Sequence, residues 1–416
     1  MNRIAPLALV PFLALPIAAQ ETASPGPLLT LRTTQTRVAH RVARELGMQL
    51  SVSHDGDQCV TLTLGRDRGT AVEVRDGDGP LLELEADVQG LLQAYEKELV
   101  GYQAMMRGVM VMSMQQQGMP VKDAAAFVGQ MLAFPEQLSK ATLRVTGDPK
   151  FAEGGLDIEF ALEARPDSAM GKVVADLRPS PAGAPVLDGE APIAMRVSMD
   201  PKGLAALASQ LTRTTLAMAY QEGESFDAMV KVTERMFADA DGGMVFAIDS
   251  AMTMQMILGF QKAETLQDMF TSGEYQDAIR GQRLLDRNME VTVTPAAFEH
   301  RGVTFLKSHV TNDGPPNPVM PDGETTSFTA AAAGFLVMSG NESEARGMVD
   351  AALDGKIERA ALPDESLLTL DVRVPAMVEL FGAALPRRVR PEDLPAAAKI
   401  ALAAKGRRLV LTVHVE

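Results

Sequence analysis

The sequence predicts an α+β fold: a large, mainly antiparallel and curved sheet with amphipathic helices packed on one face. Apolar and polar residues alternate strictly in several segments, Asp-Gly or Gly turns join such segments, and helical patterns lie between them. Alternation with a period of two gives each strand one apolar and one hydrated face, as in an antiparallel sheet covered on one side. A doubly wound parallel sheet is disfavoured because its strands would be continuous apolar runs.

The first residues indicate export. Arg3 provides a short basic region, residues 4–17 form an apolar run, and Ala19 ends a small-residue cleavage site. This order is typical of a secretory signal peptide, and the run is too short and too rich in proline for a membrane span. We predict a signal peptide at 1–19 and an exported protein, periplasmic or extracellular, that does not span a membrane after cleavage.

Strict alternation predicts strands in four places and hairpins in others. The four strands are expected at 156–164, 192–200, 367–374 and 407–416. Asp-Gly lies between two alternating runs in 51–62 and again in 72–84, which predicts hairpins there.

A proline-rich stretch suggests how the chain is divided. We predict an N-terminal α+β module at 20–178, a linker at 179–192 and C-terminal α+β modules at 193–416. Separate domains and two halves of one continuous sheet both fit this division.

Helical periodicity predicts helices from Asp87 to Val109, from Pro120 onward, and at 201–220 and 224–238. A weak internal repeat accompanies them, in which a strand is followed by an aspartate and then by a helix that opens with Gly-Leu. Its first two copies contain Asp87 and Asp200, which we expect to cap helices and not to act as catalytic residues.

The composition excludes several function classes. The 416 residues include 39 Lys+Arg against 54 Asp+Glu, a net charge of -15 that argues against nucleic-acid binding. The single cysteine, Cys59, excludes an intramolecular disulfide and a multi-thiolate zinc site. We expect Cys59 to be a semi-buried structural residue, with an intermolecular disulfide or a reactive thiol as the alternative.

Motifs for enzyme chemistry are absent from the sequence. It contains no Gly-x-Ser-x-Gly, no His-Glu-x-x-His, no phosphate-binding loop and no dinucleotide fingerprint, and we predict no cofactor. An exported hydrolase whose site combines His300 or His309 with a serine and an acid stays an alternative. The acidic groups at 54–57, 76–79 and 239–243 lack the ligand spacing of a calcium loop and are expected to be turns.

Methionine is the unusual residue, with 25 in the chain. Six of them lie within residues 105–119, in a Met-rich helix where Met106, Met110 and Met114 are our candidates for an adaptable apolar binding groove. Met252, Met254 and Met256 would share one face of a strand, and such thioether clusters can bind Cu(I) in exported proteins.

The segment TTSFTAAAAGFLVMSGNESEARGMVDAALDG, followed by SLLTLDVRVPAMVELF, resembles uncharacterised secreted or periplasmic bacterial proteins built from repeated strand–helix modules. The resemblance covers residues 290–386 and implies export and architecture, but no activity. The sequence therefore predicts a non-enzymatic envelope protein that binds an apolar ligand or a protein partner. The hydrolase and the Cu(I)-binding protein are the alternatives.

Overall fold

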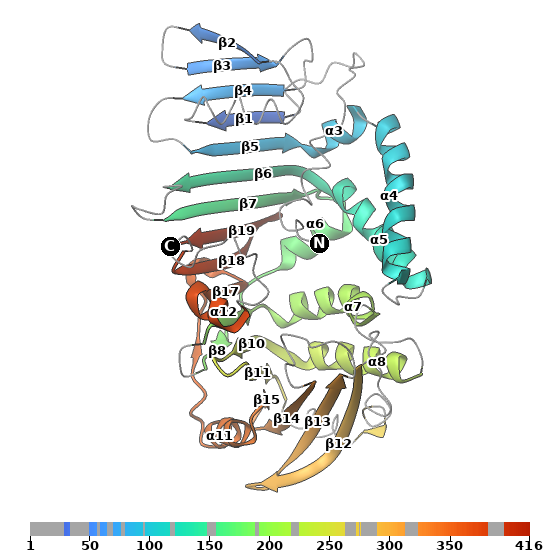
Figure 1. The fold of residues 1–416 in the computed structure, drawn as a ribbon, viewed down its shortest axis with the longest axis vertical. Coiled ribbons are helices and arrows are strands. Elements are labelled where there is room, and N and C mark those ends of the chain that lie inside the picture. The colour runs from blue at the N-terminus through green and yellow to red at the C-terminus, as the bar shows by residue number, and fades with distance from the viewer. Residues whose placement is uncertain are drawn as a thin grey trace. The chain divides into compact units, whose positions relative to one another are not determined.

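The structure is a computed structural model, and Figure 1 shows its fold. It describes residues 29–33, 50–55, 59–64, 70–75, 80–94, 96–116, 121–147, 155–187, 191–217, 224–262, 272–273, 275, 289–312, 323–381 and 395–416. The predicted signal peptide at 1–19 and the predicted turn at 76–79 lie outside these residues. Among the helices within them, none has both the length and the apolar character needed to cross a membrane.

The chain folds into two compact units. Unit 1 contains residues 1–108, 131–172 and 407–416, and unit 2 contains residues 109–130 and 173–406. The last strand of the chain thus belongs to the first unit.

Unit 1 is built on an open, mainly antiparallel sheet. Its strands are β1 (Leu29–Thr33), β2 (Leu50–Asp55), β3 (Cys59–Leu64), β4 (Thr70–Arg75), β5 (Leu82–Asp87), β6 (Leu138–Gly147), β7 (Leu156–Ala164) and β19 (Arg408–Val415). Their order is β2-β3-β4-β1-β5-β6-β7-β19, and only β1 and β4 pair in parallel. The strand predicted at 156–164 is confirmed.

The helices that follow β5 begin where the sequence predicts. The carboxylate of Asp87 accepts a hydrogen bond from the Gly90 amide at 3.0 Å and so caps the first of them. The helical elements between β5 and β8 (Ala184–Pro185) are α3 (Val88–Ala94), α4 (Glu96–Gln116), α5 (Val121–Ala133), η1 (Phe134–Gln137) and α6 (Ala169–Asp176). The division between the units falls within α4, α5 and α6.

The main strands of unit 2 all pair antiparallel with their neighbours. These strands are β9 (Ile193–Ser198), β10 (Ala240–Ile248), β11 (Met254–Phe260), β12 (Met289–His300), β13 (Val303–Asn312), β14 (Glu324–Ala332), β15 (Phe335–Ser339), β17 (Leu368–Arg373) and β18 (Ala397–Lys405). Their order is β18-β17-β9-β10-β11-β15-β14-β13-β12.

Two short strands accompany this sheet, β8 (Ala184–Pro185) and β16 (Arg359–Ala360), and they pair with each other. Residues 184–185 belong to the linker predicted at 179–192, which in the structure lies within unit 2.

Helices lie on both faces of the unit 2 sheet, whereas the sequence predicts them on one. The helices are α7 (Pro201–Ala217), α8 (Glu224–Asp239), α11 (Glu342–Leu353) and α12 (Val374–Phe381). Val349 of α11 is fully buried with Val245, Ile257 and Phe305, whose side chains occupy one face. Leu204 of α7 and Met236 of α8 pack with Leu258 and Leu336, on the other face.

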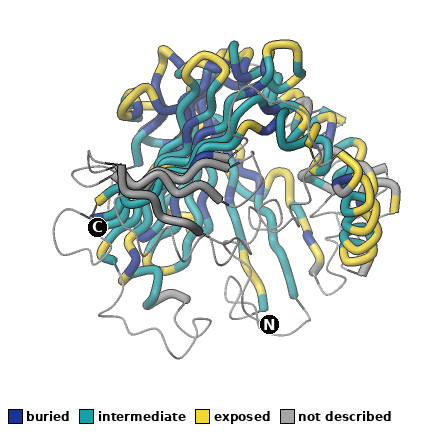
Figure 2. The backbone as a smooth tube through the Cα atoms, turned by 90° about the horizontal axis from the view of Figure 1, so that it is seen from above, coloured by how far each residue is buried: buried dark blue, intermediate teal, exposed yellow. Residues whose placement is uncertain are grey.

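Both faces are covered because apolar and polar residues do not alternate in β11 and β15. MQMILGF and FLVMS place apolar residues on both faces of the sheet, so both faces need cover. Figure 2 colours each residue by its burial, and most strand residues are of intermediate exposure.

A buried ion pair fixes β16 over the sheet of unit 2. The Arg359 guanidinium donates to the Asp241 carboxylate, and the two side chains are 22% and 14% exposed. Arg359 also lies over the Phe335 ring, 4.9 Å from its centroid. Gly259 is required beneath this pair, because a β-carbon there would overlap both charged groups.

We therefore predict that Gly259→Ala lowers the free energy of unfolding by about 2–3 kcal/mol, because the ion pair must move. Arg359→Met should cost roughly as much, since it leaves the Asp241 carboxylate largely buried without its cation. Urea unfolding measures the free energy of unfolding of both variants.

Gly347→Ala in α11 is the matched control, because a β-carbon there meets nothing within 4 Å. It should raise stability by up to about 1 kcal/mol, and a loss equal to that of Gly259→Ala would contradict the account.

Candidate functional site: apolar sheet faces and the Met-rich helix

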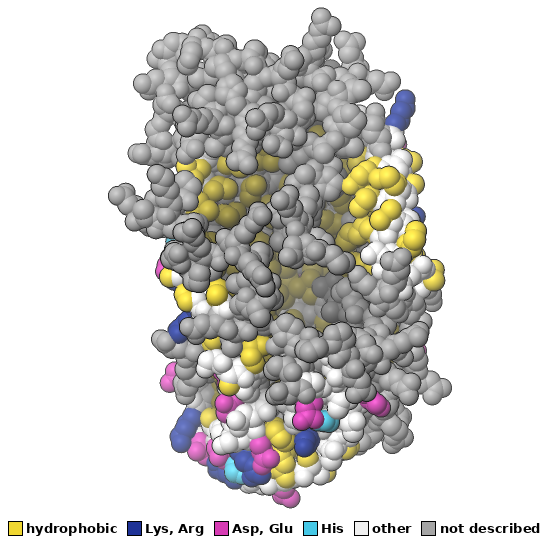
Figure 3. Space-filling model, in the orientation of Figure 1, with side chains coloured by type: hydrophobic (Ala, Val, Ile, Leu, Met, Phe, Trp, Pro, Cys, Tyr) yellow, Lys and Arg dark blue, Asp and Glu magenta, His cyan; other side chains and the backbone are white. Residues whose placement is uncertain are grey.

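One face of the unit 1 sheet is apolar across neighbouring strands. Leu84, Leu143, Phe160 and Leu411 stand directly opposite one another on β5, β6, β7 and β19. All four are half-buried, as are the apolar residues two positions before and after them. Figure 3 shows apolar side chains at the surface over this part of unit 1 and along α4.

The other face of the same strands carries charges that pair across the sheet. Lys140 lies 2.8 Å from Glu85, and Arg408 lies 3.0 Å from Glu159. His414 Nδ1 lies 2.6 Å from the Asp157 carboxylate. These side chains are partly exposed, so each pair contributes little to stability, and this is the hydrated face that the alternation predicts.

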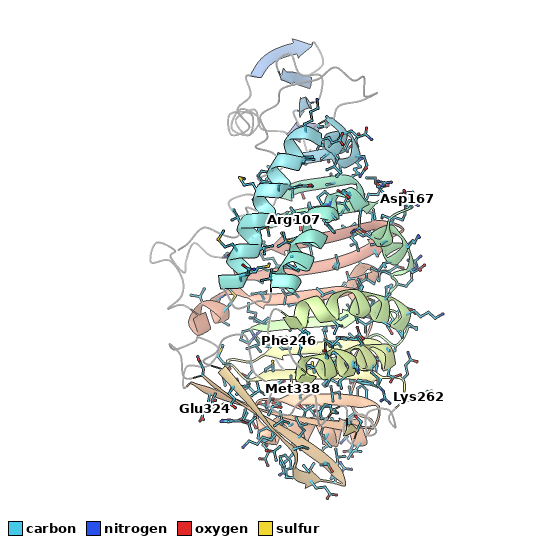
Figure 4. The ribbon with its side chains drawn as sticks, turned by 90° about the vertical axis from the view of Figure 1, so that its right-hand side faces the viewer. Arg107, Asp167, Phe246, Lys262, Glu324 and Met338 are labelled. Carbon is cyan, nitrogen blue, oxygen red and sulfur yellow. The ribbon has the colours of Figure 1, made fainter. Side chains whose placement is uncertain are left out.

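The unit 2 sheet carries a row of methionines that the sequence alone does not reveal. Met195, Phe246, Met256 and Met338 stand directly opposite one another on β9, β10, β11 and β15, and we name these four residues the methionine row. All four are half-buried. The row continues through Leu370 of β17, so uncharged side chains face one way over neighbouring strands. Figure 4 labels Phe246 and Met338 on their strands.

Part of this face lies under helices. Val232 and Met236 of α8 pack with Met244 and Met256 against a core of Ala240, Leu258, Phe260 and Leu336. Next to the row, Ile193, Ile248 and Met254 form a second line across β9, β10 and β11, and these side chains are half-buried too. The face is therefore covered beside α7 and α8, whereas Ile193, Ile248 and Met254 belong to no described core cluster.

The three methionines predicted for Cu(I) do not share a strand. Strand β11 begins at Met254, and Met252 lies in the preceding turn with φ 62°. The Asp249 carboxylate accepts from the Thr253 amide at 2.7 Å and holds this turn. Met254 and Met256 do point to one face, but the methionine directly opposite Met256 is Met338 of β15. The expected position of Met252 on the strand was wrong, because the turn held by Asp249 includes Met252 and the strand begins only at Met254.

The candidates on the Met-rich helix lie on one side of α4. Met106, Met110 and Met114 are half-buried, as is Tyr102, and Leu99 on that side is 7% exposed. Val109, three residues after Met106, would lie on this side in a seven-residue repeat but is 57% exposed. Because a straight helix has 3.6 residues per turn, its buried side departs from a strict seven-residue repeat, and Met110 lies on that side instead of Val109.

The histidines named for a hydrolase have other partners. His300 Nε2 lies 2.8 Å from the Asp350 carboxylate, which also accepts from Arg301 at 3.1 Å. His309 Nδ1 lies 3.1 Å from the Thr326 hydroxyl, and its Nε2 lies 3.6 Å from Glu324.

The His309 group contains a hydroxyl, an imidazole and a carboxylate, but Glu324 is 64% exposed. Acyl transfer depends on donors that act where water is excluded, and this surface does not exclude it. The contacts of the two histidines therefore do not favour the hydrolase alternative.

Sequence reasoning also missed the role of Asp241, in the acidic group at 239–243. Its carboxylate accepts from the Gly243 amide at 2.8 Å and pairs with Arg359, so its oxygens are occupied. Gly242 and Gly243, which follow Asp241, were the sequence signal that another segment of the chain approaches closely here.

Within the described ranges, no cluster of three or more His, Cys, Asp or Glu side chains could hold a metal ion.

No protein-family model matches this chain, and neither a curated protein nor a solved structure matches it significantly. Arguments about function therefore rest on the geometry above.

The charges at the C-terminal end of α11 predict a pH dependence. Asp350 accepts from His300 and Arg301, and these contacts lower its pKa. Lys356 and Arg301 likewise lower the pKa of Asp354. A carboxyl whose pKa is lower in the folded state adds stability above its unfolded pKa, and this is lost as pH falls.

We expect thermal unfolding to show a stability loss below about pH 4 that is smaller in the Asp350→Asn/Asp354→Asn variant. Glu290→Gln, an exposed acid on β12, is the control and should leave the pH profile unchanged. Identical acid profiles for the wild type and the double variant would refute the role of these two carboxylates.

Proposed function

We propose that this chain is an exported, non-enzymatic protein that binds an apolar ligand on the face of the unit 2 sheet that carries the methionine row. The observation that carries the proposal is the row itself, with its half-buried, uncharged side chains in direct cross-strand register. Apolar surface left in contact with water costs free energy, which an apolar ligand would recover.

The shape of the row supports a long and flexible ligand. Neighbouring strands are about 4.8 Å apart, so four strands offer roughly 14 Å of apolar surface perpendicular to them. Leu370 and Ile400 extend the line over two more strands, β17 and β18. An acyl chain lying across the strands would contact one side chain per strand and would need no polar partner along this line.

The residue types support a ligand of variable structure. Methionine is unbranched and polarizable, so it adapts its shape to different apolar partners. Met256 also packs on the core beside α8, whereas Met195, Phe246 and Met338 belong to no described core cluster. We infer that these three side chains supply most of the contact.

Export is part of this proposal and rests on the predicted signal peptide at 1–19. The internal module repeat is likewise proposed, from the strand, aspartate and helix order at Asp87 and Asp200. Both aspartates accept a hydrogen bond from an amide of the first helical turn, which is consistent with reuse of one local design.

The test is titration of the purified chain with a fluorescent fatty acid, together with mass spectrometry of lipids that copurify with it. Met338→Lys should weaken binding about tenfold or more, because the ligand would have to contact or displace a charge. Met338→Leu should bind nearly as well as the wild type, because it keeps volume and apolar character.

The matched control is Thr292→Lys. It adds the same charge to an exposed position of β12, on the opposite face of the same sheet. Equal binding by both lysine variants, or no binding by the wild type, would count against the methionine row as the site.

A further inference from the structure

The outer side of α4 is apolar and open. Val100 is 63% exposed, Met105 and Val109 are each 57% exposed, and Met112 is 56% exposed. They supply half of the large apolar side chains that are exposed among the described residues. Exposed apolar side chains gathered on one helix are typical of an interaction surface.

Small residues lie among these large ones on the same side of the helix. Gly101, Ala104, Gly108 and Ser113 are exposed. A β-carbon built at Gly101 or at Gly108 meets nothing within 4 Å, so each glycine leaves an open depression. Large and small residues are thus interspersed along the exposed stripe, which we define as positions 101, 104, 105, 108, 109 and 112.

This arrangement of large and small residues is complementary to itself in one antiparallel register. When position 105 of one helix faces position 108 of another, each large residue meets a small one. The pairs are Met105 with Gly108, Met112 with Gly101, and Val109 with Ala104, whereas Val100 and Ser113 lie at opposite edges of the exposed side and do not face each other. The relation holds in both directions, as the two-fold symmetry of an isologous contact requires.

We propose that this stripe of α4 is the contact of a homodimer, in which two copies of α4 pack antiparallel with the side chains of Met105 and Met112 over Gly108 and Gly101 of the other copy. Glycine beneath each methionine lets the helix backbones approach closely, as in ridges-into-grooves packing.

A second copy fits this surface better than an anionic membrane does. The chain carries a net charge of -15, which disfavours approach to acidic lipid. The same charge makes two copies repel each other, but salt screens that repulsion and leaves the apolar contact intact. Dimerisation should therefore strengthen between low and physiological ionic strength.

The size of the contact sets the expected affinity. A helix of 21 residues is about 30 Å long, and one helix pair covers less than the roughly 800 Å² per partner of a standard interface. We therefore expect a weak, concentration-dependent dimer, with a dissociation constant of about 10–100 μM.

The first experiment is sedimentation velocity on the full chain at increasing concentration. The wild type should pass from monomer to dimer, and Gly101→Leu/Gly108→Leu should stay monomeric because both depressions are filled. Helix stability should not fall, since leucine is the better helix former and neither site has a close neighbour. Gly347→Leu, an exposed glycine of α11 with equally open surroundings, is the matched control and should dimerise like the wild type.

The second experiment tests the register by oxidative crosslinking in a Cys59→Ser background. A mixture of Met105→Cys and Gly108→Cys chains should form a disulfide-linked dimer. A mixture of Met105→Cys and Gly101→Cys chains should not, because those positions lie about two helical turns out of register.

Three results would overturn the proposal. They are a wild type that stays monomeric up to about 500 μM, well above the expected dissociation constant, a dimer that survives Gly101→Leu/Gly108→Leu, and a dimer that Gly347→Leu abolishes.

Discussion

The structure depends on the cross-strand register of residues that alternate with a period of two. In unit 1 this register places Leu84, Leu143, Phe160 and Leu411 in one line and leaves Glu85, Lys140 and Glu159 on the opposite face. A slip of one residue would exchange the faces and bring charges to the apolar side, so the register is strongly specified. The apolar faces, the hydrated ion pairs and the methionine row all follow from it.

The sequence predicted local elements well because alternation and capping are local signals. The strand at 156–164 and the caps at Asp87 and Asp200 could be derived from a few neighbouring residues, and the structure confirms them. The sheet class was also predicted, since only an antiparallel sheet tolerates one hydrated face. The sequence analysis did not predict helices on both faces of the unit 2 sheet, although the consecutive apolar residues of β11 and β15 indicate it.

Long-range pairings could not be predicted in the same way. The pairing of Met256 with Met338 joins strands that are far apart in the chain, and no local pattern encodes it. The Asp241–Arg359 pair is similar, because a buried cation near a given aspartate is a property of topology. The methionine row was therefore not predicted: sequence reasoning named Met256 only as a Cu(I) ligand, and Met252, which was expected beside it on the strand, lies in a turn.

Strand β19 gives the molecule an order of assembly. It completes the unit 1 sheet beside β7, although all of residues 173–406 separate the two strands along the chain and belong to unit 2. A growing chain cannot complete unit 1 until residues 407–416 have been synthesised, and until then the edge of β7 that pairs with β19 is unpaired. Closing so long a loop is slow, so the earlier unit is completed after the later one has been synthesised.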